Sequence, residues 1–284
     1  NMGARERAPM TTHYDNHMQT INTYTELNRL REKFKVNHRR KLNVIDVFCG
    51  AGGLSLGFYL VGYRILGGLD KDENASRTYS MNLGAPVLVT NIEDTMPCKF
   101  KSFIKRENGI GRLRNMIAIA GPPCRPFSNA NVRRRAEMHP EYSAVMNFAS
   151  FVLELDCLGV VVENVKTFNN TLKDFLGAFE ERGYVCICQN LNSLYFGVPQ
   201  NRVRLFFIAI KQDVLKGDDD LKDKFMHHID TAKDIIYRSM EVDQEQIVTV
   251  SDAIGDLPPL NRSGRSGSIK RYGSEPRTPY QKFL

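Results

Sequence analysis

The 284-residue sequence has no tryptophan, no C-x-x-C pair and no apolar run close to the ~18 residues that a membrane-spanning helix needs. Its N-terminal stretch lacks the hydrophobic segment of a secretory signal. The six cysteines are scattered, which is unlike a disulfide framework or a structural zinc site. These absences argue against a secreted, disulfide-rich or membrane-spanning protein and predict an intracellular one that needs no metal.

Positive charge is in excess. The 39 lysines and arginines outnumber the 32 acidic residues, which gives a formal net charge of +7 and a pI of about 9.1. Such a balance fits a polyanionic partner, but many basic proteins bind none. Charge alone therefore leaves nucleic acid open as a ligand, and the motifs must decide.

Composition divides the chain into three parts. Residues 1–41 form a polar, basic extension in which the capping box Thr23-x-x-Glu26 predicts a helix. Residues 42–260 alternate short apolar runs with amphipathic stretches and are predicted to be one folded domain. Residues 261–284 are rich in Gly, Ser, Pro and Arg without apolar periodicity, which predicts a linker.

The pattern in 42–260 predicts an α/β fold, a Rossmann-like, mostly parallel sheet with helices on both faces and function at the carboxyl ends of the strands. Two later apolar runs, "YVCICQNL" and "RLFFIAI", are predicted to be antiparallel edge strands, and residues 211–250 a surface excursion. Buried strands are predicted at 43–48, 64–70, 86–90, 116–121 and 159–164, and helices at 53–62, 143–155 and 171–182.

A glycine-rich turn follows the first strand, with Gly50, Gly52 and Gly53 leading into a helix. Glycines let the backbone approach a ligand, and the helix start leaves N–H groups free to bind it. The turn is not the full G-x-G-x-x-G fingerprint, because Gly57 falls outside the required spacing, so a purely structural turn fits equally well. The second strand, however, ends at Asp70, about 20 residues further on, where an acid can accept hydrogen bonds from ribose hydroxyls. Together they predict a nucleoside-containing cofactor.

Two residues extend this predicted site. Asn91 follows the third strand and could hydrogen-bond an adenine edge. Phe48 could offer the cofactor a stacking or packing face, although an ordinary core position explains it as well.

The stretch "GPPCRPFSNANVRRR" presents Cys124 behind Pro122 and Pro123 at the end of the fourth strand. A thiolate is a strong nucleophile, and neighbouring positive charge raises the ionised fraction of a thiol. The prolines restrict the approach to the cysteine. Taken alone, the stretch also fits an idle cysteine in a proline-rich turn.

Two further groups are predicted at the same sheet edge. The strand "GVVVEN" ends in Glu163 and Asn164, and Arg202 and Arg204 share one face of a later strand by period-2 alternation. A lone Glu or an arginine pair is usually structural. Thiol, carboxyl and guanidinium groups at adjoining strand ends instead predict an active site.

Together these motifs resemble the cytosine-C5 DNA methyltransferase family. The resemblance runs from about Asn43 to the chain end, since "TVSDAIGDLPPL" is similar to the segment that leads into the family's target-recognition domain. The matching elements, in the family's order, are Phe48-x-Gly50-x-Gly52-Gly53, Asp70, Pro123-Cys124 with Phe127-Ser128, Glu163-Asn164-Val165 and Gln200-x-Arg202-x-Arg204.

The resemblance implies a methyltransferase domain over 42–260 that uses S-adenosyl-L-methionine to methylate C5 of a cytosine flipped out of double-stranded DNA. The sequence leaves open whether the enzyme serves restriction-modification or acts as an orphan or epigenetic methyltransferase. Cys124 would add to C6 of the base, Glu163 would protonate or hydrogen-bond N3, and Arg204 would hold O2 beside Arg202. The cofactor residues it implies are Phe48, Gly50, Gly52, Gly53, Asp70, Lys71, Asn91, Ile92 and Pro123. The DNA contacts it implies are Ser128, Arg133, Arg134 and Arg135, in a loop that closes over the flipped base.

The chain also departs from the family pattern. Lys71 stands where the family often has Trp, Asn91 where it has Asp, and Arg125 where Gln is common. The target-recognition domain and a later Gly-Asn-Ser type motif do not occur in the sequence. This predicts a truncated enzyme, or one subunit of a split enzyme with a second polypeptide as partner, which by itself binds cofactor weakly and methylates DNA poorly or not at all.

Two alternatives remain from the sequence. An RNA cytosine-C5 methyltransferase would carry nearly the same motifs. A catalytically silent DNA-binding subunit would not be expected to keep Cys124, Glu163 and Arg204 together. The expected location is the cytoplasm, at the nucleoid, in a prokaryote, or the nucleus in a eukaryote.

Overall fold

The computed structural model describes residues 42–127, 139–170, 172–215, 220–240, 247–257 and 275–283. The helix predicted near Thr23 and the segment that holds Ser128 and Arg133–Arg135 lie outside these described residues.

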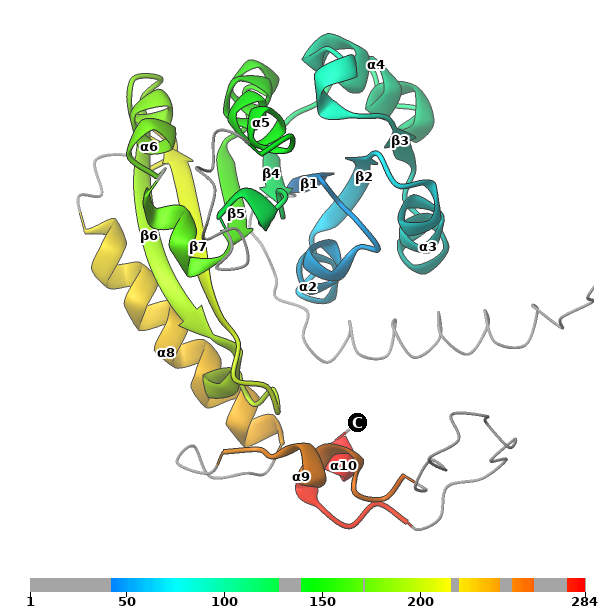
Figure 1. Ribbon diagram of the computed structural model, residues 1–284, viewed down its shortest axis with the longest axis vertical. Coiled ribbons are helices and arrows are strands. Elements are labelled where there is room, and N and C mark those ends of the chain that lie inside the picture. Colours follow the sequence, from blue (N-terminus) through cyan, green and yellow to red (C-terminus); the bar gives the residue numbers. More distant parts are fainter. Residues whose placement is uncertain are drawn as a thin grey trace, which may run out of the picture.

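The described residues form one seven-stranded sheet in the order β3-β2-β1-β4-β5-β7-β6 (Figure 1). β1 lies between β2 and β4, and all neighbouring pairs from β3 to β5 are parallel. Chain order thus reverses at β1, where a doubly wound sheet opens its ligand crevice. The strands are β1 (Asn43–Val47), β2 (Arg64–Asp70), β3 (Val87–Val89), β4 (Met116–Ala120), β5 (Gly159–Asn164), β6 (Tyr184–Asn192) and β7 (Val203–Lys211).

The two late strands are antiparallel to their neighbours, as predicted. The prediction that both lie at the edge is wrong for β7, which is inserted between β5 and β6. The chain passes β5, forms the outer strand first and then returns between the two. An apolar run with buried alternate residues fits an internal antiparallel strand as well as an edge strand, so composition could not separate the cases.

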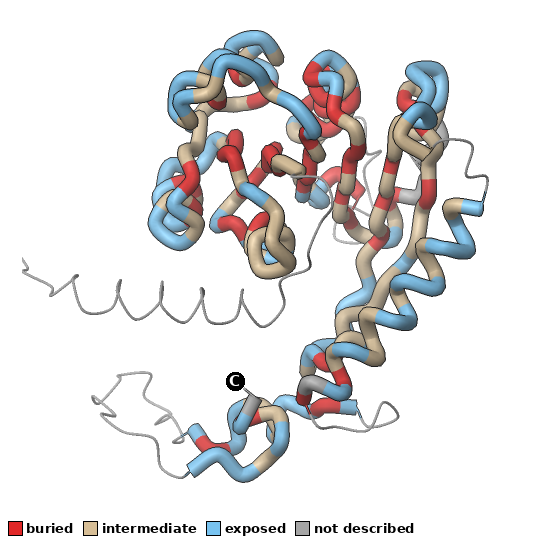
Figure 2. The backbone as a smooth tube through the Cα atoms, turned by 180° about the vertical axis from the view of Figure 1, so that it is seen from behind, coloured by how far each residue is buried: buried red, intermediate tan, exposed pale blue. Residues whose placement is uncertain are grey.

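Helices cover both faces of the sheet. In Figure 1, α2 and α3 lie on one side of the central strands and α4, α5 and α6 on the other. Figure 2 shows buried residues concentrated in the central strands and on the helix sides that face them. These helices are α2 (Gly53–Leu60), α3 (Glu73–Leu83), α4 (Pro97–Asn108), α5 (Tyr142–Leu155) and α6 (Leu172–Glu180).

Phenylalanine supplies the aromatic bulk of the core under α5 and α6. The rings of Phe148 and Phe175 stack with their centroids 6.0 Å apart, and Phe207 of β7 meets Phe175 edge-on at 5.2 Å. All three side chains are buried. Such contacts pack β7 against α5 and α6.

The predicted surface excursion contains α8 (Leu221–Ser239), a 19-residue helix beside β6 and β7 (Figure 1). It packs on η6 (Ser193–Phe196), where the Tyr237 hydroxyl donates to the carbonyl of Leu194 at 3.4 Å.

The predicted linker 261–284 includes α10 (Pro279–Phe283), which packs on α9 (Val250–Ile254) through a hydrogen bond from Thr278 Oγ1 to the Asp252 carbonyl. The remaining helices are α7 (Gln212–Leu215), η1 (Ile92–Asp94), η2 (Arg125–Phe127) and η5 (Lys166–Asn170). Within the described ranges, the chain has no helix whose length and apolar character would let it cross a membrane.

Candidate active site

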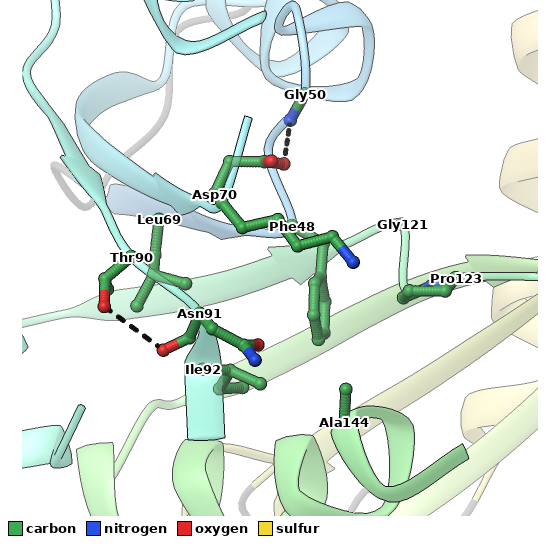
Figure 3. A pocket seen from close by; sticks show the side chains of 11 residues that line it. Phe48, Gly50, Leu69, Asp70, Thr90, Asn91, Ile92, Gly121, Pro123 and Ala144 are labelled. Atoms are coloured by element: carbon green, nitrogen blue, oxygen red, sulfur yellow. Dashed lines mark hydrogen bonds between the residues drawn. The ribbon is translucent and has the colours of Figure 1, made fainter. Parts of the chain in front are cut away.

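A cavity of about 230 Å³ opens at the carboxyl ends of β1 to β4 (Figure 3). Complete small-molecule sites usually exceed about 300 Å³, so this volume suits the nucleoside part of a larger ligand. Seven residues predicted for the cofactor line it: Phe48, Gly50, Asp70, Lys71, Asn91, Ile92 and Pro123. Four lining residues were not predicted: Leu69, Thr90, Gly121 and Ala144.

The turn after β1 is held by the acid at the end of β2. The backbone N–H of Gly50 donates to Asp70 Oδ2 at 2.8 Å (Figure 3). The N–H of Asp72 donates to Asp70 Oδ1 at 2.9 Å. These bonds fix the carboxylate at the cavity wall. Each oxygen keeps a second acceptor site, so Asp70 can still accept hydrogen bonds from a ligand.

Phe48 takes a backbone conformation with φ +61°, which is rare for a residue with a side chain. Its N–H donates to the Leu69 carbonyl at 2.8 Å, and its ring lies 5.9 Å from that of Phe148. One edge of the ring therefore joins the core while the residue lines the cavity. The core interpretation of Phe48 is confirmed, and its contact with a cofactor stays a prediction.

Asn91 lies at the cavity, where its side-chain amide donates to Glu93 Oε2 at 3.2 Å. This contact engages one N–H of the amide, and Oδ1 is available as an acceptor for a ligand. Beside it, Ile92 is buried and gives the cavity an apolar wall.

Gly52 and Gly53 do not belong to the cavity lining. Gly52 caps α2 with φ +95°, and a Cβ there would lie 2.9 Å from Leu83 Cδ1 and 3.0 Å from Tyr79 Cδ2. The glycine at this position lets α2 and α3 approach each other. Its predicted contact with a cofactor, and that of Gly53, remain predictions.

Buried polar side chains of β1, α2 and α3 contact one another next to the glycine-rich turn. Ser55 donates to Asp46 Oδ2 at 2.7 Å, and its oxygen lies 2.8 Å from the Tyr79 hydroxyl. Asp46 Oδ1 is buried without a hydrogen-bond partner among the described residues. Burial raises the pKa of Asp46 to about 7, the charge of Asp70 adds to this rise, and the bond from Ser55 opposes it. Asp46 was not among the predicted site residues, although an acid inside the apolar run "NVIDVF" is a visible signal in the sequence.

The carboxyl and guanidinium groups predicted at the sheet edge meet. Glu163 Oε1 lies 3.0 Å from Arg204 Nε and 3.6 Å from Arg202 Nη2. About a quarter of the Glu163 side chain is exposed. The three side chains line a second cavity, of about 340 Å³, whose other walls are Leu191, Ser193, Phe196, Val198 and Phe206.

Cys124 is exposed in the loop after β4. β4 and β5 are paired neighbours, with Ala120 opposite Val162, so this loop and Glu163 lie at the same sheet edge. The two loops are tied together because Asn164 Nδ2 donates to the Pro122 carbonyl at 3.5 Å and Thr167 Oγ1 donates to the Phe127 carbonyl. The structure thus brings the nucleophile's turn to the loop that follows the acid.

The sequence and fold were compared with known proteins. A candidate type II methyltransferase of Oceanobacillus iheyensis is 31% identical over 85% of this chain and 60% of its own length, and the type II methyltransferase M.DdeI of Desulfomicrobium norvegicum is 31% identical over 86% and 54%. A crystal structure of a candidate DNA modification methyltransferase from an Escherichia coli prophage shares the fold, with a TM-score of 0.56 and 24% identity over 77% of this chain and 56% of that one.

The chain spans little more than half the length of these relatives. The profile of one family, described as C-5 cytosine-specific DNA methylase, matches residues 42–280, which include both cavities and Cys124. The chain therefore belongs to the C-5 cytosine-specific DNA methylase family.

Proposed function

We propose that this protein methylates C5 of cytosine in double-stranded DNA inside the cell, with S-adenosyl-L-methionine as methyl donor. The observation that carries the proposal is the ion-paired group of Glu163, Arg202 and Arg204 at the same sheet edge as the exposed Cys124. Family membership supports the reaction class.

The first cavity fits the nucleoside end of this cofactor. Asp70 and Asn91 offer oxygen acceptors for ribose hydroxyls and an adenine amino group, while Phe48, Leu69, Ile92 and Ala144 provide apolar walls. When bound, the cofactor supplies an electrophilic methyl group on a sulfonium. Binding at the carboxyl ends of β1 to β4 places it beside the loop that carries Cys124.

The protein's own groups would make C5 of cytosine reactive. The Cys124 thiolate forms a bond to C6, and the electron pair of the C5–C6 double bond moves toward C5 and the ring. Glu163 donates a proton or hydrogen bond at N3, and Arg204 donates to O2, so the charge is stabilised as it develops. After C5 has gained its methyl group, loss of the C5 proton restores the double bond and releases the thiolate.

The ion pairs of Glu163 support the positioning of its carboxyl group, and the proposed donation to N3 requires that this group carries a proton when the base binds. The Arg204 Nε contact fixes the carboxyl group and the guanidinium relative to each other, which pre-orients two polar groups toward one edge of a base. The cytosine must leave the helical stack to reach them, at a cost of a few kcal/mol. Ser128 and Arg133–Arg135 are proposed to contact DNA phosphates at this step.

Covalent trapping tests the proposal. DNA containing 5-fluorocytosine has no C5 proton to lose, so the adduct with the thiol should persist after methyl transfer. We expect a denaturation-resistant protein–DNA complex that requires S-adenosyl-L-methionine and is absent in Cys124→Ser. Because the complex accumulates, even slow turnover is detected. Trapping of tRNA alone under the same conditions would refute the proposed substrate, and a complex that persists in Cys124→Ser would refute the proposed nucleophile.

A further inference from the structure

Glu141 contacts two cations, Lys71 in the lining of the first cavity and Arg125 next to Cys124. It precedes α5, whose residue Ala144 lines the first cavity. Its Oε1 lies 3.2 Å from Lys71 Nζ and 3.9 Å from Arg125 Nη1. Lys71 also lines the cavity, whereas Arg125 follows Cys124 and is not part of the lining.

The environment of this carboxylate differs from that of an ordinary surface acid. Only 18% of the Glu141 side chain is exposed, and its Oε2 is buried with no hydrogen-bond partner among the described residues. A poorly hydrated charge depends on the cations beside it more than an exposed charge does. Lys71 supplies the shorter of the two contacts.

Lys71 is itself 61% exposed, so its long side chain would otherwise sample many rotamers. The ion pair with Glu141 limits this freedom, because it holds the Lys71 ammonium at the start of α5. The aliphatic part of the Lys71 side chain then extends from the end of β2 toward α5. Because this side chain is already ordered in the cavity wall, ligand binding does not have to pay the entropy of ordering it.

We propose that Glu141 is a positioning residue of the cofactor cavity, which acts by holding Lys71 in the cavity wall. The inference rests on the proposed use of S-adenosyl-L-methionine. It assigns to the Lys71–Glu141 pair, which joins residues 70 positions apart, a role in cofactor affinity. Arg125 shares the carboxylate but does not contribute to that affinity.

Binding of S-adenosylhomocysteine, the reaction product, measured by calorimetry, tests this without turnover. We expect Glu141→Gln and Lys71→Met to weaken binding by about three- to tenfold each, in line with a modest ion pair. In the double variant the losses should not multiply, because either change alone releases the side chain at position 71. High salt should reduce wild-type affinity toward that of Glu141→Gln.

Arg125→Met is the matched control, since it removes the other cation from the same carboxylate. It should leave the affinity unchanged within twofold. The inference is overturned if Lys71→Met binds as tightly as wild type, if Glu141→Gln still weakens binding in the Lys71→Met background, or if Arg125→Met weakens it equally. A wild-type protein that does not bind S-adenosylhomocysteine would instead refute the proposed cofactor, and the inference with it.

Discussion

Glu163 illustrates how one residue's surroundings define its chemistry. It is the penultimate residue of β5, lies opposite Phe206 of β7 in the ladder, and contacts two arginines. Conversion of Glu163 to Gln keeps the shape but removes the proton that the proposed reaction delivers to N3. We expect single-turnover methyl transfer to fall by about 10²- to 10⁴-fold, the usual share of a general acid. S-adenosylhomocysteine affinity should not change, because Glu163 is not part of the first cavity's lining. A rate within fivefold of wild type would exclude Glu163 as the acid.

Asp46 should make stability depend on pH. Its pKa is raised from the ordinary 3.8 to about 7, chiefly by burial, so the folded state holds the proton more tightly than the unfolded state. Its contribution is fully present below about pH 4 and is lost as pH rises toward 7. Between pH 5 and 8 we expect the unfolding free energy of wild type to fall by about 2–3 kcal/mol relative to that of Asp46→Asn, at ~1.4 kcal/mol per pH unit. Urea unfolding at the two pH values measures this, and parallel pH profiles for both proteins would contradict it.

At the scale of single elements, the start of α2 separates two glycines that the sequence could not tell apart. Gly52 has φ +95° and little room for a Cβ, whereas Gly53 has no atom within 4 Å of that position and opens the helix. Gly52→Ala should therefore lower the unfolding free energy by about 1–3 kcal/mol. Gly53→Ala should leave it unchanged or raise it by up to ~1 kcal/mol. Denaturant unfolding of the pair checks this.

The same pair tests whether Gly53 contacts the cofactor. If it does, Gly53→Ala should weaken S-adenosylhomocysteine binding while the protein stays stable. Equal destabilisation by both variants would show that the space available for a Cβ at the two positions does not determine their effect on stability.

Elements with strong local signals were the ones that sequence could predict. The strands β1, β2, β3, β4 and β5 are short apolar runs, and Phe48, Gly50, Asp70 and Asn91 were predicted from the ends of the first three. The other predicted cavity residues, Lys71, Ile92 and Pro123, came only from the family resemblance. Ala144 and Glu141 could not be found in this way. They reach the site because α5 packs across the sheet, and nothing in the local pattern states where a helix start lies relative to a distant strand. The insertion of β7 was missed for the same reason, since pairing partners are non-local.

For the molecule as a whole, the two ends of the sheet strands differ in the cavities and charged residues that they carry. The carboxyl edge holds both cavities and Cys124, and the amino edge carries exposed Arg64, Arg112 and Arg114 at or just before the starts of β2 and β4. With a net charge of +7, some affinity for DNA is expected from any basic surface. The proposed function requires that the contacts near Cys124 dominate.

Salt dependence of DNA binding distinguishes these possibilities. Replacement of Arg133, Arg134 and Arg135 by Ala should weaken binding and reduce the slope of log K against log salt by up to about 2.7, because each lost phosphate contact accounts for ~0.9. The triple replacement of Arg64, Arg112 and Arg114 removes the same charge from the amino edge of the sheet and should change the slope by less than one such contact. Both are read from fluorescence anisotropy titrations at several salt concentrations. Equal effects would mean that DNA responds to net charge alone. A larger effect at the amino edge would place the DNA on the wrong side of the sheet for Cys124 to reach a base.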